Sequence, residues 1–158
     1  MGRVYSINFD GVAVTAAIDF FEIAPADNKP VALIGLMLSQ SSDLGDSAEE
    51  ILRVNIVRGN TTTGTGGTQG VTPIPVNSHN DTAAGAACDT CNTTVASSGT
   101  AVNIFSHAFN IRAGMEHYFP PECRPTSSQA SGFLCVRLAA APSDSLTMSG
   151  TLFFEELF

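Results

Sequence analysis

Cysteine and histidine are the residue types in this sequence that could bind a metal or carry out redox chemistry. Cys88 and Cys91 form a Cys-x-x-Cys pair, while Cys123 and Cys135 lie further along the chain. A structural zinc site needs four ligands, which Cys123 and the histidines would have to complete in space because no second close pair exists. The histidines are His79, His107 and His117. A disulfide is a second alternative. We favour free cysteines, with Cys135 buried in a strand as a small apolar residue.

Motifs typical of enzymes are absent from the sequence, which contains neither a Gly-x-Ser-x-Gly elbow nor a His-Glu-x-x-His pair. The glycine-rich stretch 59–70 is not followed by the Lys-Ser/Thr of a phosphate-binding loop, so we expect a mobile loop there. Asp43, Asp46, Glu49 and Glu50 lack the alternating spacing of a calcium loop. We therefore predict a protein that is not an enzyme, with no catalytic residue, no cofactor and no metal site.

The composition favours a single β-rich domain. The chain has 158 residues, of which 44% are hydrophobic and 14% charged, with a formal net charge of -8. A chain of this length can be built around one core, so we expect one domain over residues 1–158. The negative charge would repel phosphate backbones, and the longest apolar run, residues 31–38, is too short to cross a bilayer. Neither nucleic acid nor a membrane is expected as a partner.

Apolar residues recur at every second position along much of the chain, which indicates strands. Leu52, Val54 and Ile56 show this alternation, as does the stretch 145–155. The expected strands cover residues 5–9, 12–16, 18–24, 31–40, 50–58, 100–111, 115–119, 132–139 and 145–155. One short helix is expected within 41–50 because Asp46 and Glu49 have capping-box spacing. Antiparallel strands with long irregular connections predict an all-β, two-sheet β-sandwich, jelly-roll-like rather than immunoglobulin-like.

Two parts of the sequence are candidates for contact between subunits. The run from Val31 to Leu38 is apolar at both odd and even positions, and Phe153 lies on the opposite face of its strand from Leu152 and Phe154. We take Val31, Leu33 and Phe153 as the candidate oligomer interface. The alternative is that these are strand residues buried within one chain.

Several segments resemble small structural proteins of tailed bacteriophages. They are Gly2-Arg-Val-Tyr-Ser-Ile, Ala26-Asp-Asn-Lys-Pro-Val, Arg58-Gly-Asn-Thr-Thr-Thr-Gly, Phe109-Asn-Ile-Arg-Ala-Gly and Ser145-Leu-Thr-Met-Ser-Gly-Thr-Leu. The resemblance implies a head decoration, or cement, protein: a jelly-roll sandwich on the capsid exterior that stabilises the shell. It further implies the major capsid protein and other copies of the chain, often as a homotrimer, as partners, with assembly in the host cytoplasm. The cysteines match no functional pattern of that family.

An alternative function is a carbohydrate- or receptor-binding β-sandwich module of a phage tail or a secreted protein. Its binding loops would be residues 59–70 and His79 to Asp81. Sugar-binding surfaces usually stack a sugar on an aromatic ring, but the chain has no tryptophan and only two tyrosines, Tyr5 and Tyr118. The sequence therefore favours the capsid function over this one.

Overall fold

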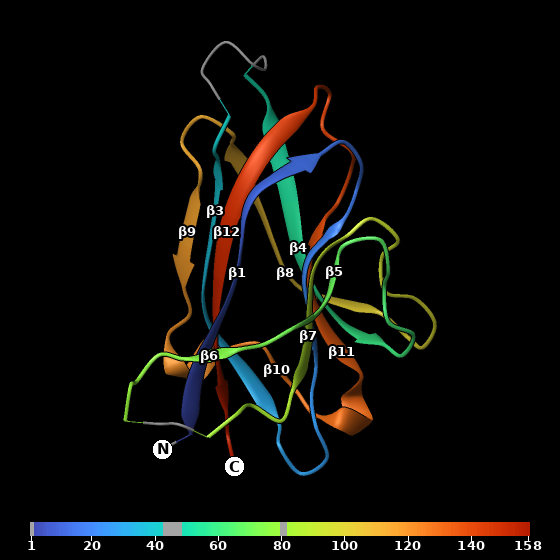
Figure 1. Ribbon diagram of the computed structural model, residues 1–158. Coiled ribbons are helices and arrows are strands. Elements are labelled where there is room, and N and C mark those ends of the chain that lie inside the picture. Colours follow the sequence, from blue (N-terminus) through green and yellow to red (C-terminus); the bar gives the residue numbers. More distant parts are fainter. Residues whose placement is uncertain (1, 43–48, 80–81) are drawn as a thin grey trace.

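The computed structural model describes residues 2–42, 49–79 and 82–158, which form two six-stranded antiparallel sheets packed face to face (Figure 1). Sheet A contains β1 (Arg3–Val14), β3 (Val31–Gln40), β6 (Ile74–Pro75), β9 (Met115–Tyr118), β10 (Thr126–Ser127) and β12 (Leu146–Glu156). Sheet B contains β2 (Asp19–Ala24), β4 (Ile51–Asn60), β5 (Thr68–Val71), β7 (Ala87–Asn92), β8 (Val102–Asn110) and β11 (Phe133–Leu138).

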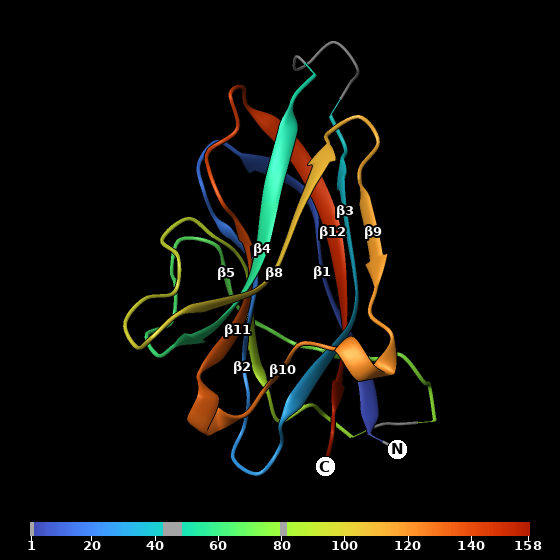
Figure 2. The same cartoon turned by 180° about the vertical axis from the view of Figure 1, so that it is seen from behind.

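The order of strands is that of a jelly roll. In sheet A the order is β10-β3-β12-β1-β6, with β9 also paired to β3, and in sheet B it is β5-β7-β2-β11-β4-β8. The first strand therefore pairs with the last, and β2 pairs with β11 in the opposite sheet, so the chain wraps around the core from both ends (Figure 2). This topology confirms the predicted all-β, two-sheet, jelly-roll-like sandwich.

Helical structure among the described residues is limited to two short 3-10 turns, η1 (Pro121–Cys123) and η2 (Gln129–Ser131). Both lie in the connection between β9 and β11, beside β10. The helix predicted within 41–50 falls mainly on residues 43–48, which lie outside the described residues. The turn η1 begins after Pro120 and has Pro121 in its first turn, where the missing amide hydrogen costs no hydrogen bond.

The core lies between the sheets and is formed by the alternating apolar residues of the long strands. Leu52, Val54 and Ile56 are buried, as the period of two predicted. In β12 the buried apolar residues are Leu146, Met148, Leu152 and Phe154, again as predicted. Aromatic rings from the two sheets meet there: the centroids of Phe9 and Phe20 are 5.7 Å apart and the rings are nearly parallel. The inward-facing side chains of the long strands thus form the apolar core.

The position of β3 corrects one part of the expected interface. Val31 is 0% exposed and Leu33 is 1% exposed, so both side chains belong to the core of a single chain and present no surface to a second one. The strand looked apolar on both faces because the pairing of β3 with β12 shifts by one residue between Leu33 and Gly35. The buried positions are therefore Val31 and Leu33 before the shift, and Leu36 and Leu38 after it. Its outward positions are also covered in part by neighbouring side chains. Phe153, by contrast, is partly exposed and pairs with Gly35 on the outer face of sheet A.

Candidate functional site

Two carboxylates of β2 are buried on the outer face of sheet B. Asp19 is 0% exposed and Glu22 is 2% exposed, although both lie on the side of the sheet away from the main core. They are covered by two loop segments, 61–67 and 93–99, which pair with each other through the bridges Thr62↔Ser97 and Thr65↔Thr94. Buried carboxylates are stable only where donors or cations compensate them, so their partners define what this region does.

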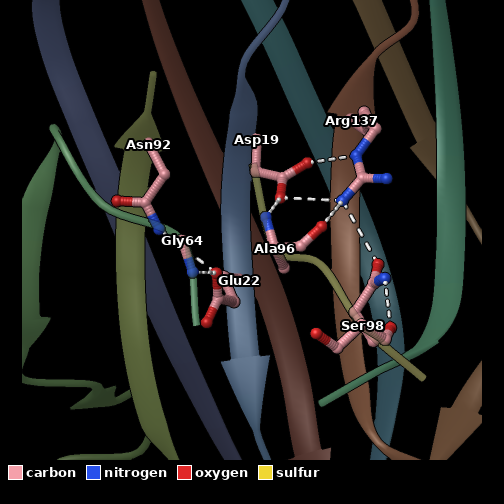
Figure 3. A network of polar contacts seen from close by, with 8 residues as sticks. Asp19, Glu22, Gly64, Asn92, Ala96, Ser98 and Arg137 are labelled. Carbon is pink, nitrogen blue, oxygen red and sulfur yellow. Dashed lines mark hydrogen bonds and ion pairs between the residues drawn. The ribbon is translucent and has the colours of Figure 1, made fainter. Parts of the chain in front are cut away.

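Asp19 is bound by a guanidinium and by one of the covering loops (Figure 3). Arg137 of β11 donates from Nε to Oδ1 at 2.6 Å and from Nη2 to Oδ2 at 3.1 Å. The backbone amide of Ala96 donates to Oδ2 at 2.8 Å. The hydrogen bond to Asp19 raises the pKa of Arg137, against the opposing effect of burial. Arg137 therefore stays charged, and its contacts with Asp19, together with the Ala96 amide, hold segment 93–99 on the sheet.

Arg137 also contacts residues outside this ion pair. Its Nη2 donates to the carbonyl oxygen of Ala96 at 3.0 Å and to Oδ1 of Asn60 at 3.3 Å. The amide nitrogen of Asn60 in turn donates to the carbonyl oxygen of Ser98 at 3.1 Å (Figure 3). One guanidinium thus links β2, β4 and the loop that follows β7.

Glu22 holds the other loop segment in the same way. Its Oε1 accepts a hydrogen bond from the Thr63 hydroxyl at 2.6 Å, and its Oε2 accepts one from the Gly64 amide at 2.9 Å. Asn92 of β7 donates to Oε2 at 3.2 Å. The stretch 59–70, predicted to be a mobile loop, instead lies on sheet B, is fixed there by polar contacts, and continues into β5. We call these contacts of Asp19, Glu22, Asn60, Asn92 and Arg137 the polar clamp.

The polar clamp brings together the one group among the described residues that could hold a metal ion: Asp19, Glu22 and Cys135, whose ligand atoms lie within 4.8 Å of one another. The donor set fits a cation poorly, because every carboxylate oxygen already accepts a hydrogen bond and the Arg137 cation lies against Asp19. Burial and the nearby carboxylates raise the pKa of the Cys135 thiol, which keeps it protonated. The geometry is that of a structural contact.

The cysteines are free, with Cys88, Cys91 and Cys135 buried and Cys123 exposed. This agrees with the interpretation that we favoured from the sequence, including the burial of Cys135. Burial raises the pKa of Cys91 to about 12 and raises that of Cys88 as well, where Asp89 adds to the effect. Thiols that stay protonated are poor nucleophiles and poor metal ligands, so the Cys-x-x-Cys pair lacks the reactivity of a redox motif.

Two of the three histidines come together, which the sequence did not indicate. The ring centroids of His107 on β8 and His117 on β9 are 6.5 Å apart. Phe105 and Phe119 pack around His117 at 4.9 and 4.5 Å, and this ring cluster closes the core between the edge strands of the two sheets. His79 lies elsewhere, in an exposed turn after β6. Of the sugar-binding loop suggested at His79 to Asp81, residues 80–81 lie outside the described residues.

The acidic residues before β4 are only partly described. Asp43 and Asp46 lie outside the described residues. The Glu49 carboxylate accepts a hydrogen bond from Asn110, and that of Glu50 accepts from the amide and the hydroxyl of Ser143. These contacts connect the start of β4 to neighbouring loops.

On the outer face of sheet A, a row of directly paired residues runs across five of the six strands. The pairing Ile74↔Ser6↔Phe153↔Gly35↔Tyr118 runs through β6, β1, β12, β3 and β9. Ile74 is 57% exposed and Tyr118 is 53% exposed. A Cβ atom at position 35 would lie only 2.5 Å from Cδ1 of Tyr118, so the tyrosine ring lies over Gly35. We call these five residues the sheet A row.

Charge on this face is small and partly neutralised. Glu155, two residues after Phe153, forms an ion pair with Arg124 at 3.0 Å. Further along the face, the hydroxyl of Ser149 donates to Asp10 at 2.6 Å. The sheet A row is therefore a largely apolar strip, with charged neighbours in Glu155, which is paired with Arg124, and in the exposed Glu116 of β9.

None of the helical segments among the described residues has the length and hydropathy needed to span a bilayer.

Comparison with known proteins assigns no family. No family model matches the chain, and no curated protein matches it. Among solved structures, it is similar to a chain of the T13 viral particle of IBDV, with 18% identity over 98% of this chain and 39% of that one, and a TM-score of 0.17. A chain of T=1 particles derived from infectious bursal virus gives 13% identity over 99% and 38%, with a TM-score of 0.12. This chain spans less than half the length of either, and at these TM-scores neither similarity supports a conclusion.

Proposed function

We propose that this chain is a structural protein of a virion: a decoration protein that binds the exterior of a bacteriophage head and stabilises it through subunit contacts. The observation that carries the proposal is the sheet A row, an exposed apolar strip on a rigid sheet. The sequence resemblance to phage structural proteins names the shell, formed by the major capsid protein, and further copies of the chain as the partners. The proposal assigns no catalytic residue.

The size of the outer face of sheet A suits a protein contact. Three long strands with about 4.8 Å spacing and about 3.3 Å per residue, with the short edge strands added, make a face of roughly 600 Å². A specific interface typically buries about 800 Å² on each partner, so this face could supply most of one. Burial of Ile74, which is 57% exposed, would by itself contribute about 1–2 kcal/mol.

The chemistry of the sheet A row also favours association over a reaction. Ser6 and Gly35 are the small members of the row and separate the larger Ile74, Phe153 and Tyr118. A surface of alternating height can interlock with a partner, as closely packed interfaces require. Because Glu155 is paired with Arg124, a partner that covers the row would leave no unpaired charge from that residue.

Phe153→Glu tests this proposal. The side chain is outward on β12, so the variant should keep the fold, while a carboxylate in the middle of the sheet A row should weaken association. Sedimentation measures the oligomer, and co-sedimentation with heads that lack the protein measures capsid binding. We expect at least a tenfold loss of capsid binding, which corresponds to about 1.4 kcal/mol.

Ile51→Glu is the matched control, because it places the same charge at an exposed apolar strand position on the other sheet. Its sedimentation and capsid binding should equal those of the unmodified protein. A Phe153→Glu protein with unchanged oligomeric mass and unchanged capsid binding would contradict the proposal.

A further inference from the structure

The outer face of sheet B contains a shallow cleft beyond the edge of the loops that cover β2 and β11. Its volume is about 430 Å³, within the size range of small-molecule sites. Its lining comprises Arg53 and Asn55 from β4, Asn103, Ser106, His107 and Ala108 from β8, and Ala139 after β11. We call this the sheet B cleft. It shares no residue with the sheet A row, and its function does not depend on the proposed function.

The strand register places the polar residues of the cleft side by side. Arg53 pairs with Ala108, and Asn55 pairs with Ser106, on the two neighbouring strands. Residues directly opposite each other on antiparallel strands have Cβ atoms about 5 Å apart, and next-but-one residues on a strand are about 7 Å apart. The guanidinium, the amides and the hydroxyl can therefore reach one small ligand together.

The side chains of these polar residues have no partner within the ranges 2–42, 49–79 and 82–158. Among the described residues, the side chains of Arg53, Asn55, Asn103 and Ser106 form no hydrogen bond or ion pair. The polar clamp lies on the same face of sheet B. There Arg137 of β11, which pairs with Asn55 of β4, forms an ion pair with Asp19. The same sheet face thus has one saturated polar region and one with its donors and acceptors available.

The charge of the cleft is opposite to that of the protein. The chain carries a formal net charge of -8, yet the cleft contains the cation of Arg53 and no carboxylate. The His107 ring does not add to this charge, because it lies on the other face of β8, with Phe105 and His117. A single guanidinium fork matches the two oxygens of a carboxylate, whereas a phosphate dianion is usually held by several donors or cations. The anionic group that fits best is one carboxylate.

The other residues that line the cleft indicate what the ligand carries besides its carboxylate. The amides of Asn55 and Asn103 can each donate and accept, which is what a row of neighbouring hydroxyls requires. Ala108 and Ala139 provide a low apolar wall against which the C–H face of a sugar ring could pack. We propose that the sheet B cleft binds an acidic sugar, with its carboxylate on Arg53 and its hydroxyls on Asn55, Asn103 and Ser106.

An NMR titration of the full chain tests this assignment, with chemical-shift changes of backbone amides in β4 and β8 as the readout. The probes are N-acetylneuraminic acid and glucuronic acid, which distinguish a sialylated source from a uronic-acid polysaccharide. N-acetylglucosamine is the neutral control and acetate is the control for a bare carboxylate. We expect at least one acidic sugar to shift the amides around Arg53 and Asn55, and to bind about tenfold or more tightly than either control.

Variants separate the two halves of the site. Arg53→Gln should weaken the acidic sugar about tenfold or more, because it removes the charge-assisted pair. Arg3→Gln makes the same charge change at an exposed position on the other sheet and should leave binding within twofold. Asn55→Leu should weaken the sugar severalfold but leave acetate unchanged. If circular dichroism shows that Asn55→Leu is unfolded, Asn103→Ala on the edge strand replaces it.

Four results would overturn the assignment. They are an absence of shifts around the cleft with every probe, equal binding of the neutral sugar, acetate bound as tightly as the acidic sugars, and an Arg53→Gln protein with undiminished affinity. The third result would leave a site for small anions only. Loss of sugar binding in Arg53→Gln with intact capsid binding would show that the two surfaces act independently.

Discussion

Substitution of Arg137 by methionine should destabilise the fold strongly, because it leaves a buried carboxylate without its cation. Asp19 is 0% exposed and would be left with neutral partners, the Ala96 amide and the Cys135 thiol. Loss of one member of a buried ion pair typically costs about 3–5 kcal/mol. Since the Arg137 side chain is 20% exposed, water can reach part of the site, and we expect the lower end, about 3 kcal/mol.

The measurement is urea unfolding followed by far-UV circular dichroism at pH 7, arranged as a double-mutant cycle. The single variants are Arg137→Met and Asp19→Leu, and the third protein carries both changes. We expect the double variant to be more stable than the sum of the single effects predicts, by roughly 1–3 kcal/mol, because removing both charges also removes the desolvation cost. Arg3→Met, at an exposed position, should change stability by less than about 0.5 kcal/mol.

The same proteins also report on the loops. Arg137 binds the Ala96 carbonyl and, through Asn60, the strand that leads into segment 61–67. Limited proteolysis should therefore cut Arg137→Met within 61–67 or 93–99 sooner than it cuts Arg3→Met. A cost below about 1 kcal/mol for Arg137→Met, or strictly additive effects in the cycle, would refute the view that this ion pair fixes the loops.

Two further predictions concern the thiols and a close backbone contact. Burial raises the pKa of Cys91 from 9.0 to about 12. Between these pH values the unfolded chain loses a proton that the folded chain keeps, so this thiol should lower the free energy of unfolding by about 1.4 kcal/mol per pH unit. Urea unfolding at a series of pH values should show a correspondingly smaller fall for Cys91→Ala, and identical pH profiles of the two proteins would contradict the assignment. Gly67→Ala should cost about 1–3 kcal/mol in the same assay, since its Cβ would lie 2.1 Å from the Thr90 carbonyl oxygen. An unchanged free energy of unfolding in Gly67→Ala would show that segment 61–67 can move away from the Thr90 carbonyl.

The strands were readable in the sequence because their burial follows a period of two. Leu52, Val54 and Ile56, and the apolar residues of β12, lie where alternation placed them. Val31 and Leu33 could not be placed in the same way, because a run of apolar residues does not say which of its faces meets the core and which meets a partner. That depends on β12 and β9, which are distant in sequence.

The polar clamp and the sheet B cleft were not predicted, since both depend on contacts between residues far apart in the chain. Asp19 and Arg137 are separated by 118 positions. One signal was present: two carboxylates, Asp19 and Glu22, interrupt an otherwise apolar stretch in β2, and charged residues in a buried strand usually have partners. That signal could have suggested a cover over sheet B, but not the identity of the covering loops.

The pairing of β1 with β12 has a consequence for how the protein folds. Arg3 pairs with Glu156 and Val14 with Leu146, so a central ladder of sheet A joins segments from near the two termini, which lie at the same end of the sandwich (Figure 1). During synthesis β1 must wait until residues 146–156 have left the ribosome before it can acquire this neighbour. Topologies dominated by such distant pairings fold slowly, and the waiting strand edges are exposed to aggregation. Expression at low temperature should therefore raise the yield of folded protein, because cooling weakens the hydrophobic attraction between exposed strand edges.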